Sequence, residues 1–135
     1  MIYTGLVSRL LIPDIMKGEV RVSDCIFCKI INKEIPSTVV YEDDKVLAFK
    51  DINPEASVHV LVVPKQHIKN IEDINKDNAD VLKDIHFAIQ KVAEKTGVST
   101  TGYRVITNCG ADGGQTVFHL HYHVLGGEKL KTTVL

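Results

Sequence analysis

Three histidines stand at alternate positions near the end of the chain: His119, His121 and His123. They are half of the six histidines in 135 residues. A neutral imidazole can act as a nucleophile near pH 7, while a neighbouring ring donates hydrogen bonds to charge that develops on a phosphate. In a strand, alternate side chains share one face and step by about 6.6 Å. The spacing therefore predicts three imidazoles on one surface, serving one small ligand.

The residues just before this run favour a phosphate as that ligand. Gly113, Gly114, Gln115 and Thr116 offer backbone N–H groups, an amide and a hydroxyl, all of which suit oxyanions. The same histidines also fit a catalytic metal, held by a His-x-His pair and a third imidazole from a neighbouring strand. At this point both hypotheses stand.

Cys25 and Cys28 form a Cys-x-x-Cys unit. The pair supplies two of the four ligands that a structural zinc site needs, so its partners must come from elsewhere in the chain. The alternative is a redox pair at a helix N-terminus, which is less favoured because the βαβ pattern of thioredoxin-like proteins is missing. Three cysteines make no disulfide framework and predict a reducing compartment, the cytoplasm. Cys109 is interpreted as an ordinary small residue.

The first half of the chain predicts one short helix and three strands. Residues 25–33 have helix-like apolar spacing after Ser23 and Asp24, either of which can cap a helix. The β-rich segments 38–43 and 45–51 predict a hairpin around a polar turn. Residues 58–63 predict a strand covered on both faces, in which His59 is partly buried.

The second half predicts one long helix followed by a return to the sheet. Between Asn75 and Gly97, apolar residues recur at 3.6-residue spacing, and Gly97 suits the helix end. Residues 103–108 and 115–125 predict two further strands. Because neighbouring strands follow one another without intervening helices, we expect an α+β protein with one antiparallel sheet and its main helix on one face.

Length and composition limit the remaining possibilities. The chain suits a single domain, which we assign to residues 23–135, with residues 1–22 as a poorly ordered N-terminal extension. A formal charge of −1 leaves no dense basic face for nucleic acid. The chain contains no apolar stretch long enough for a membrane span. We therefore expect neither a nucleic-acid partner nor a membrane.

The run His119-Leu120-His121-Tyr122-His123-Val124-Leu125 resembles the signature of the histidine triad (HIT) superfamily: His, apolar, His, apolar, His, apolar, apolar. The flanking stretches NCGADGGQTVF and CIFCKIINKEIPSTVVYEDDKVLAFKDINPEASVHVLVVPKQHI are similar to its Hint branch, the purine nucleoside phosphoramidases. The resemblance runs from about Asp24 to Gly127. It implies the HIT fold: about five antiparallel strands with one long and one short helix, forming a homodimer with one continuous larger sheet.

The resemblance also implies an activity and assigns roles to residues. His121 would attack the α-phosphorus of a purine nucleoside 5′-phosphoramidate and form a nucleotidyl-histidine that water hydrolyses, with His123 and His59 as further catalytic residues. Purine nucleotides such as AMP or GMP would be bound through Asp51 at the ribose, through Asn108, Gln115 and Thr116 near the phosphate, and through Phe27, Ile30, Phe49 and Ile52 around the base. Without the resemblance, these last four would simply be core residues. In microbial HIT proteins a structural Zn²⁺ is completed by residues that match His67 and His119.

Two departures from the family pattern affect specificity. Thr116 stands where family members usually carry serine, and the tail KLKTTVL lacks the tryptophan of animal Hint proteins. The triad also occurs in dinucleoside polyphosphate hydrolases and nucleotidylyl transferases, which spacing does not separate from phosphoramidases. A nucleotide-binding or zinc-binding module without turnover is the alternative outside enzymes.

Overall fold

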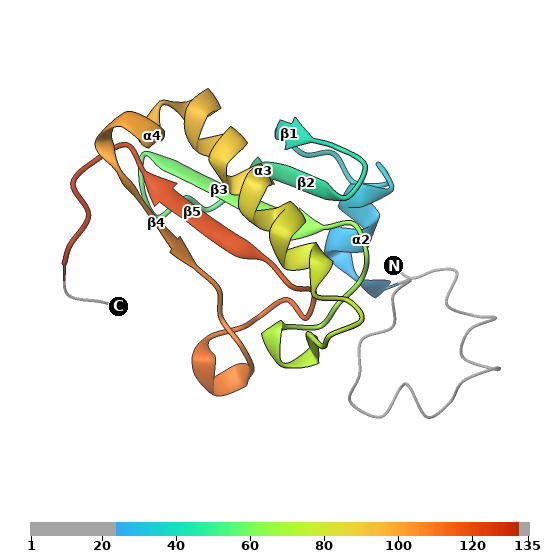
Figure 1. Ribbon diagram of the computed structural model, residues 1–135. Coiled ribbons are helices and arrows are strands. Elements are labelled where there is room, and N and C mark those ends of the chain that lie inside the picture. Colours follow the sequence, from blue (N-terminus) through green and yellow to red (C-terminus); the bar gives the residue numbers. More distant parts are fainter. Residues whose placement is uncertain (1–23, 133–135) are drawn as a thin grey trace, which may run out of the picture.

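In the computed structural model the described residues are 24–132, so the predicted extension 1–22 lies outside them. The sheet has five antiparallel strands in the order β1-β2-β3-β5-β4 (Figure 1). Their bounds are β1 Val39–Glu42, β2 Val46–Lys50, β3 Val58–Pro64, β4 Tyr103–Ile106 and β5 Tyr122–Gly126. β1 and β4 are the edge strands, and β3 lies at the centre.

The long helix α3, Asp80–Thr96, crosses one face of the sheet (Figure 1). Its buried residues repeat at helical spacing and pack against the sheet side chains of that face, including Val60, Val62 and Val124. Gly97 ends the helix in the left-handed conformation at φ 83°, which glycine adopts without steric cost. A second short helix, α4, Val98–Thr101, leads into β4.

The short helix α2, Ile26–Ile31, covers the opposite face of the sheet. Alternation in β2 and β3 sends Leu47, Phe49, Leu61 and Val63 to this side, where they pack against α2. Both faces of β3 are therefore covered, as its nearly continuous apolar sequence predicts. The predicted helix cap is corrected: the N-cap of α2 is Cys25, and not Asp24, and its Sγ accepts from the Cys28 N–H at 3.4 Å. Ser23, the other predicted cap, lies outside the described residues.

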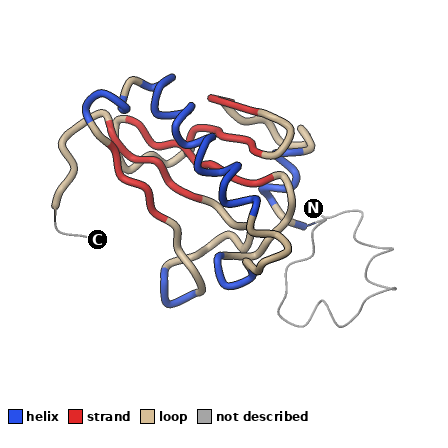
Figure 2. Tube along the Cα trace, viewed as in Figure 1, coloured by secondary structure: helices blue, strands red, loops and turns tan. Residues whose placement is uncertain are grey.

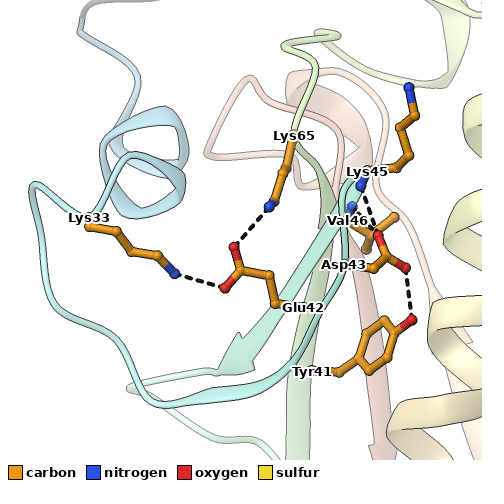
Figure 3. A network of polar contacts seen from close by, with 7 residues as sticks. All are labelled: Lys33, Tyr41, Glu42, Asp43, Lys45, Val46 and Lys65. Atoms are coloured by element: carbon orange, nitrogen blue, oxygen red, sulfur yellow. Dashed lines mark hydrogen bonds and ion pairs between the residues drawn. The ribbon is translucent and has the colours of Figure 1, made fainter.

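A carboxylate ties the end of α2 to the sheet. Glu42, the last residue of β1, accepts from Lys33 Nζ at 2.9 Å and from Lys65 Nζ at 2.8 Å (Figure 3). Lys33 follows α2 and Lys65 follows β3. Next to this bridge, Asp43 accepts from the backbone N–H groups of Lys45 and Val46 and from the Tyr41 hydroxyl, which closes the turn between β1 and β2.

Two loops meet at the end of the sheet where β5 begins. Each contains a single 3-10 turn, η3 Ile71–Asp73 and η4 Ala111–Gly113, and the two turns lie side by side (Figure 2). Gln115 joins them, because its Nε2 donates to the Lys69 carbonyl and its Oε1 accepts from Asn70 Nδ2.

The prediction of one long strand over residues 115–125 is wrong. β5 begins only at Tyr122, so His119 and His121 precede the strand and His123 alone lies within it. The segment before Tyr122 bonds to a different part of the chain: the Leu120 N–H donates to the Ile68 carbonyl. The His119 side chain is 0% exposed and lies against the two cysteines of the N-terminal segment. The alternation of sides is nevertheless confirmed: His119 and His121 pack against Phe27 on the α2 side, where His123 also lies. Leu120, Tyr122 and Val124 pack in the cluster on the α3 side.

The fold class is confirmed as α+β with one antiparallel sheet, a long helix and short helices. Among residues 24–132, no helix combines the length and apolarity required to span a bilayer. The homodimer stays a prediction, because the structure contains one chain.

Candidate active site and metal centre

A pocket of about 870 Å³ opens between α2, the sheet face beneath it and the chain that precedes β5. Its lining combines apolar side chains on the α2 side with imidazoles on the β5 side. The predicted site residues in this lining are Phe27, Ile30, Phe49, Asp51, Ile52, His59, Thr116, His121 and His123. Residues from both ends of the domain thus line one pocket, and their roles stay predictions.

His121 presents one free ring nitrogen to this pocket. Its Nδ1 lies 2.7 Å from the His119 carbonyl oxygen, and a carbonyl can only accept, so Nδ1 carries the proton. The Nε2 lone pair is then left for attack. The ring of Phe27 packs edge-on against His121, with centroids 5.0 Å apart, and His121 is only 6% exposed.

His123 and His59 form a second pair of imidazoles beside His121. His59 lies on β3 and His123 on β5, and His59 Nε2 is 2.9 Å from His123 Nδ1. Their rings lie on the same sheet face as Leu61, because Leu61 is opposite His123 in the register and two residues from His59. Asp51, immediately after β2, places Oδ2 3.4 Å from His59 Nε2.

Burial favours the neutral form of the two triad rings in the pocket, His121 and His123. It lowers the pKa of His121, and it lowers the pKa of His123 to about 4, with the neighbouring His121 and His59 adding to the shift. Both rings are therefore neutral at pH 7. A neutral His121 is the nucleophilic form of imidazole.

The third triad histidine belongs to a separate cluster. His119 Nδ1 lies 3.4 Å from Cys25 Sγ, 3.6 Å from Cys28 Sγ and 3.1 Å from His67 Nδ1. All four donor atoms lie within 4.8 Å of one another and could hold a metal ion. Donor atoms around a tetrahedral zinc are separated by about 3.3–3.8 Å, given Zn–N of about 2.0 Å and Zn–S of about 2.3 Å. The donor set therefore fits zinc in chemistry and in spacing.

A hydrogen bond also directs a lone pair of this cluster to the point where a cation would bind. His119 Nε2 lies 2.9 Å from the Pro64 carbonyl oxygen, so Nε2 carries the proton and the Nδ1 lone pair faces the two sulfurs. The pKa of Cys25 is lowered to about 3, chiefly because the Cys28 thiol hydrogen-bonds to its thiolate. The pKa of Cys28 is raised by that neighbouring thiolate and by burial. A metal ion would supply the charge that lets both sulfurs ionise.

Two of the predicted substrate contacts lie elsewhere in the described structure. Gln115 and Asn108 are not in the pocket lining reported for residues 24–132. Both side chains bond to the loop around η4: Gln115 Oε1 accepts from the Gly110 N–H, and Asn108 Nδ2 donates to the Gly113 carbonyl. Their assignment as phosphate contacts stays a prediction. Of the four purine positions, Ile52 is 91% exposed, whereas Phe27, Ile30 and Phe49 are buried and belong to the core as well as to the pocket.

Sequence reasoning missed the backbone groups of the site. The carbonyls of Pro64 and His119 decide which nitrogen of His119 and of His121 keeps a lone pair. The Glu55 N–H, 3.0 Å from His59 Nδ1, belongs to the same class. Residue identity carries no signal for such groups, because every residue has a carbonyl and only the fold aims it.

Comparison with known proteins agrees with this geometry. Residues 24–133 match the family described as "Scavenger mRNA decapping enzyme C-term binding". Among solved structures, the chain resembles a HIT family hydrolase from Clostridium thermocellum at 57% identity, with a TM-score of 0.83 over 85% of this chain and 100% of the other. A histidine triad protein from Clostridium difficile matches at 56% identity and a TM-score of 0.81, over the same shares. The chain belongs to the histidine triad family.

A curated HIT relative carries an enzymatic name. The purine nucleoside phosphoramidase of Escherichia coli strain K12 is 43% identical over 107 residues, which cover 79% of this chain and 90% of the relative. A HIT-like protein of Synechococcus elongatus is 48% identical over 79% of this chain and 93% of its own length. The resemblance inferred from the triad and its flanks is thus confirmed, and so is the prediction of a HIT family hydrolase.

Proposed function

We propose that this protein hydrolyses purine nucleoside 5′-phosphoramidates through a covalent nucleotidyl-histidine. The observation that carries the proposal is the 2.7 Å contact between His121 Nδ1 and the His119 carbonyl oxygen, from which we infer that Nδ1 holds the proton and Nε2 keeps a lone pair in the pocket. The Escherichia coli relative, named a purine nucleoside phosphoramidase, supports the choice of substrate.

The proposed reaction has two displacements. His121 Nε2 attacks the α-phosphorus, the P–N bond breaks, and the departing nitrogen takes a proton and leaves as the amine. Water then attacks the same phosphorus, the P–Nε2 bond breaks, and the nucleoside monophosphate leaves. Phe27, Ile30 and Phe49 supply an apolar wall for the base, and Ile52 is an exposed apolar side chain that a bound base would cover.

Asp51 and Thr116 complete the proposed substrate contacts. The Asp51 carboxylate lines the pocket and can accept from ribose hydroxyls, while one of its oxygens already accepts from the Asn53 N–H at 2.8 Å. Thr116, in the lining close to the triad, offers a hydroxyl to the phosphate. We place Asn108 and Gln115 as supports of the loop from which Thr116 projects, with phosphate contact dependent on loop movement.

We also propose a structural Zn²⁺ held by Cys25, Cys28, His67 and His119. When bound, such an ion supplies a rigid cross-link and no chemistry of its own. His119 contacts both the cysteines and the nucleophile: its ring faces the cysteines, and its carbonyl accepts from His121 Nδ1. The position of the nucleophile thus depends on a residue of the metal cluster.

A homodimer, with sheets joined across a two-fold axis, is proposed on the family pattern. The edge strand β4 supports it, because its outer residues Tyr103 and Val105 are 38% and 41% exposed and unpaired backbone groups lie along that edge. Sedimentation of the wild type and of Val105→Lys tests it: we expect a dimer that the lysine weakens, and a monomeric wild type would contradict it. The free state of all three cysteines supports the proposed cytoplasmic location.

The activity is tested with adenosine 5′-phosphoramidate. The wild type should release AMP, and His121→Ala should not. His86→Ala is the matched control, since His86 is an exposed histidine of α3 outside the pocket, and it should turn over like the wild type. Acid-free quenching followed by mass spectrometry should find an adenylyl group on His121. Equal rates for the wild type and His121→Ala would refute the proposal, and faster cleavage of a dinucleoside polyphosphate would move it to that substrate class.

A further inference from the structure

The Glu55 backbone sits behind the imidazole pair on the side away from His123. Its N–H donates to His59 Nδ1 at 3.0 Å. Glu55 belongs to the segment between β2 and β3, four residues before His59, so the chain folds back on the ring of its own strand. This is the only ring nitrogen of the three pocket histidines for which the described structure gives a backbone N–H as partner.

A backbone N–H can only donate, so His59 Nδ1 must hold a lone pair. In the neutral ring the proton is therefore on Nε2. That proton points at His123 Nδ1, 2.9 Å away, in preference to Asp51 Oδ2 at 3.4 Å. His123 Nδ1 is then an acceptor as well, and the proton of neutral His123 is left on Nε2.

We propose that the Glu55 N–H is a positioning group that sets the proton pattern of the pocket. Through His59 it makes His123 an Nε2–H donor, while the His119 carbonyl makes His121 an Nε2 acceptor. The two rings are adjacent, with centroids 5.2 Å apart, and they offer different groups to a phosphate. His121 offers a lone pair that attacks phosphorus, and His123 offers an N–H that stabilises the phosphoryl oxygens. The catalytic part of this inference rests on the proposed function, whereas the tautomers do not.

The same pattern decides between two uses of the Asp51, His59 and His123 group. Its donor atoms lie within 4.8 Å of one another, which by distance alone fits a metal ion. A metal at His59 Nε2 needs the lone pair there, and the Glu55 N–H already occupies the lone pair of Nδ1. The neutral ring would have to lose its one N–H proton and become an imidazolate, or break that bond. We therefore assign this group to proton placement and expect one metal ion per chain, in the cysteine cluster.

The experiment is the imidazole ¹⁵N–¹H long-range correlation spectrum of the zinc-loaded, full-length protein at neutral pH. His59 and His123 should show the Nε2–H pattern, and His121 should show the Nδ1–H pattern as an internal contrast. A proton on Nδ1 of His59 or of His123 would overturn the inference, and so would a second tightly bound zinc per chain by elemental analysis. The wild-type spectrum alone gives this answer.

Variants at Glu55 then separate its backbone from its side chain. Glu55→Pro removes the N–H, and we expect mixed tautomers at His59 and a kcat lower by about 100-fold, as on loss of one oxyanion donor, with a smaller change in KM. Glu55→Ala removes the carboxylate, keeps the N–H and should keep the wild-type tautomer pattern. An unchanged spectrum in folded Glu55→Pro would contradict the proposal. If the wild type shows the expected tautomers but cleaves no phosphoramidate, the proposed function fails and the tautomer assignment stands.

Discussion

Histidines form two adjacent clusters, and their ring nitrogens are arranged differently in each. In the cysteine cluster, His67 and His119 point their Nδ1 atoms at one point, 3.1 Å apart, together with two sulfurs. In the pocket, the rings of His121 and His123 stand side by side, and the inferred tautomers give one a lone pair and the other a proton. In the functions proposed above, identical side chains therefore serve as metal ligands in one place and as reaction partners in the other.

The difference lies in the backbone, not in the side chains. The Pro64 carbonyl takes the Nε2–H of His119 and leaves Nδ1 to a metal, whereas the His119 carbonyl takes the Nδ1–H of His121 and leaves Nε2 to the substrate. A carbonyl on one side of an imidazole thus decides what the other side can do. His119 belongs to both clusters, through its ring and through its carbonyl.

The largest effects should come from exchanging side chains at the two triad positions. His119→Asn should lose the metal, because the amide is a poor zinc ligand. His121→Asn should keep the metal and lower turnover by about 10⁴-fold or more, because the nucleophile is gone. His119→Cys restores a ligand and should recover metal binding, with turnover within about tenfold of the wild type. Elemental analysis and phosphoramidate kinetics on the three proteins measure this, and metal loss in His121→Asn would mean that the two clusters are one.

The next effect tests the cysteine cluster alone. Cys28→Ser replaces a thiolate with a hydroxyl that does not hold zinc, so the metal should be lost and the free energy of unfolding should fall by about 3 kcal/mol or more. Cys109→Ser is the matched control, because Cys109 is a half-buried cysteine outside the metal cluster, and it should change stability by about 1 kcal/mol or less. Denaturant unfolding with metal analysis compares them. A wild type that binds no metal would contradict the proposed zinc site.

A smaller effect should appear on the pocket side as pH falls. The pKa of His123 is lowered to about 4 in the folded chain, chiefly by burial, from 6.5 in the unfolded chain. As pH falls below 6.5 the unfolded chain takes up this proton first, so stability falls between about pH 6.5 and pH 4 and this group contributes no further change below. His123→Asn should lose about 1–2 kcal/mol less than the wild type over that window. Parallel pH profiles of unfolding for the two proteins would contradict a neutral buried His123.

The sequence predicted the members of both clusters better than their arrangement. Alternation correctly placed His119, His121 and His123 on one side of the sheet but suggested three equivalent rings in one strand. The strand begins only at Tyr122, because the Leu120 N–H bonds to the Ile68 carbonyl. The assignment of His119 to the cysteines and of His121 and His123 to the substrate came from the family resemblance, because the spacing of the histidines does not distinguish them. The nearly continuous apolar run of β3 did predict its two covered faces, and the 3.6-residue spacing predicted the buried stripe of α3, because burial patterns are local in sequence.

The parts that sequence did not predict depend on contacts between distant backbone segments. Pro64 is 55 positions from His119, and its carbonyl meets His119 Nε2 only after β3 and the approach to β5 lie together. The N-cap of α2 shows the same limit, since Cys25 caps the helix with the sulfur that also faces the metal cluster. A capping pattern alone favours serine or aspartate.

The smallest effect should come from the Glu42 bridge, which ties the same helix to the sheet as the proposed metal does. Glu42 joins Lys33, just after α2, to Lys65, two residues before His67 (Figure 3). The side chains of these ion pairs are partly exposed to solvent, so Glu42→Gln should cost about 0.5–1 kcal/mol in the zinc-loaded protein. Once a chelator has removed the metal, the bridge is a remaining link between α2 and the strands, and the same substitution should cost more. Chemical unfolding of both proteins with and without chelator measures the difference. Equal costs in the two states would show that metal and ion pair act independently, and that α2 is held by its apolar contacts with Leu47 and Phe49 rather than by either link.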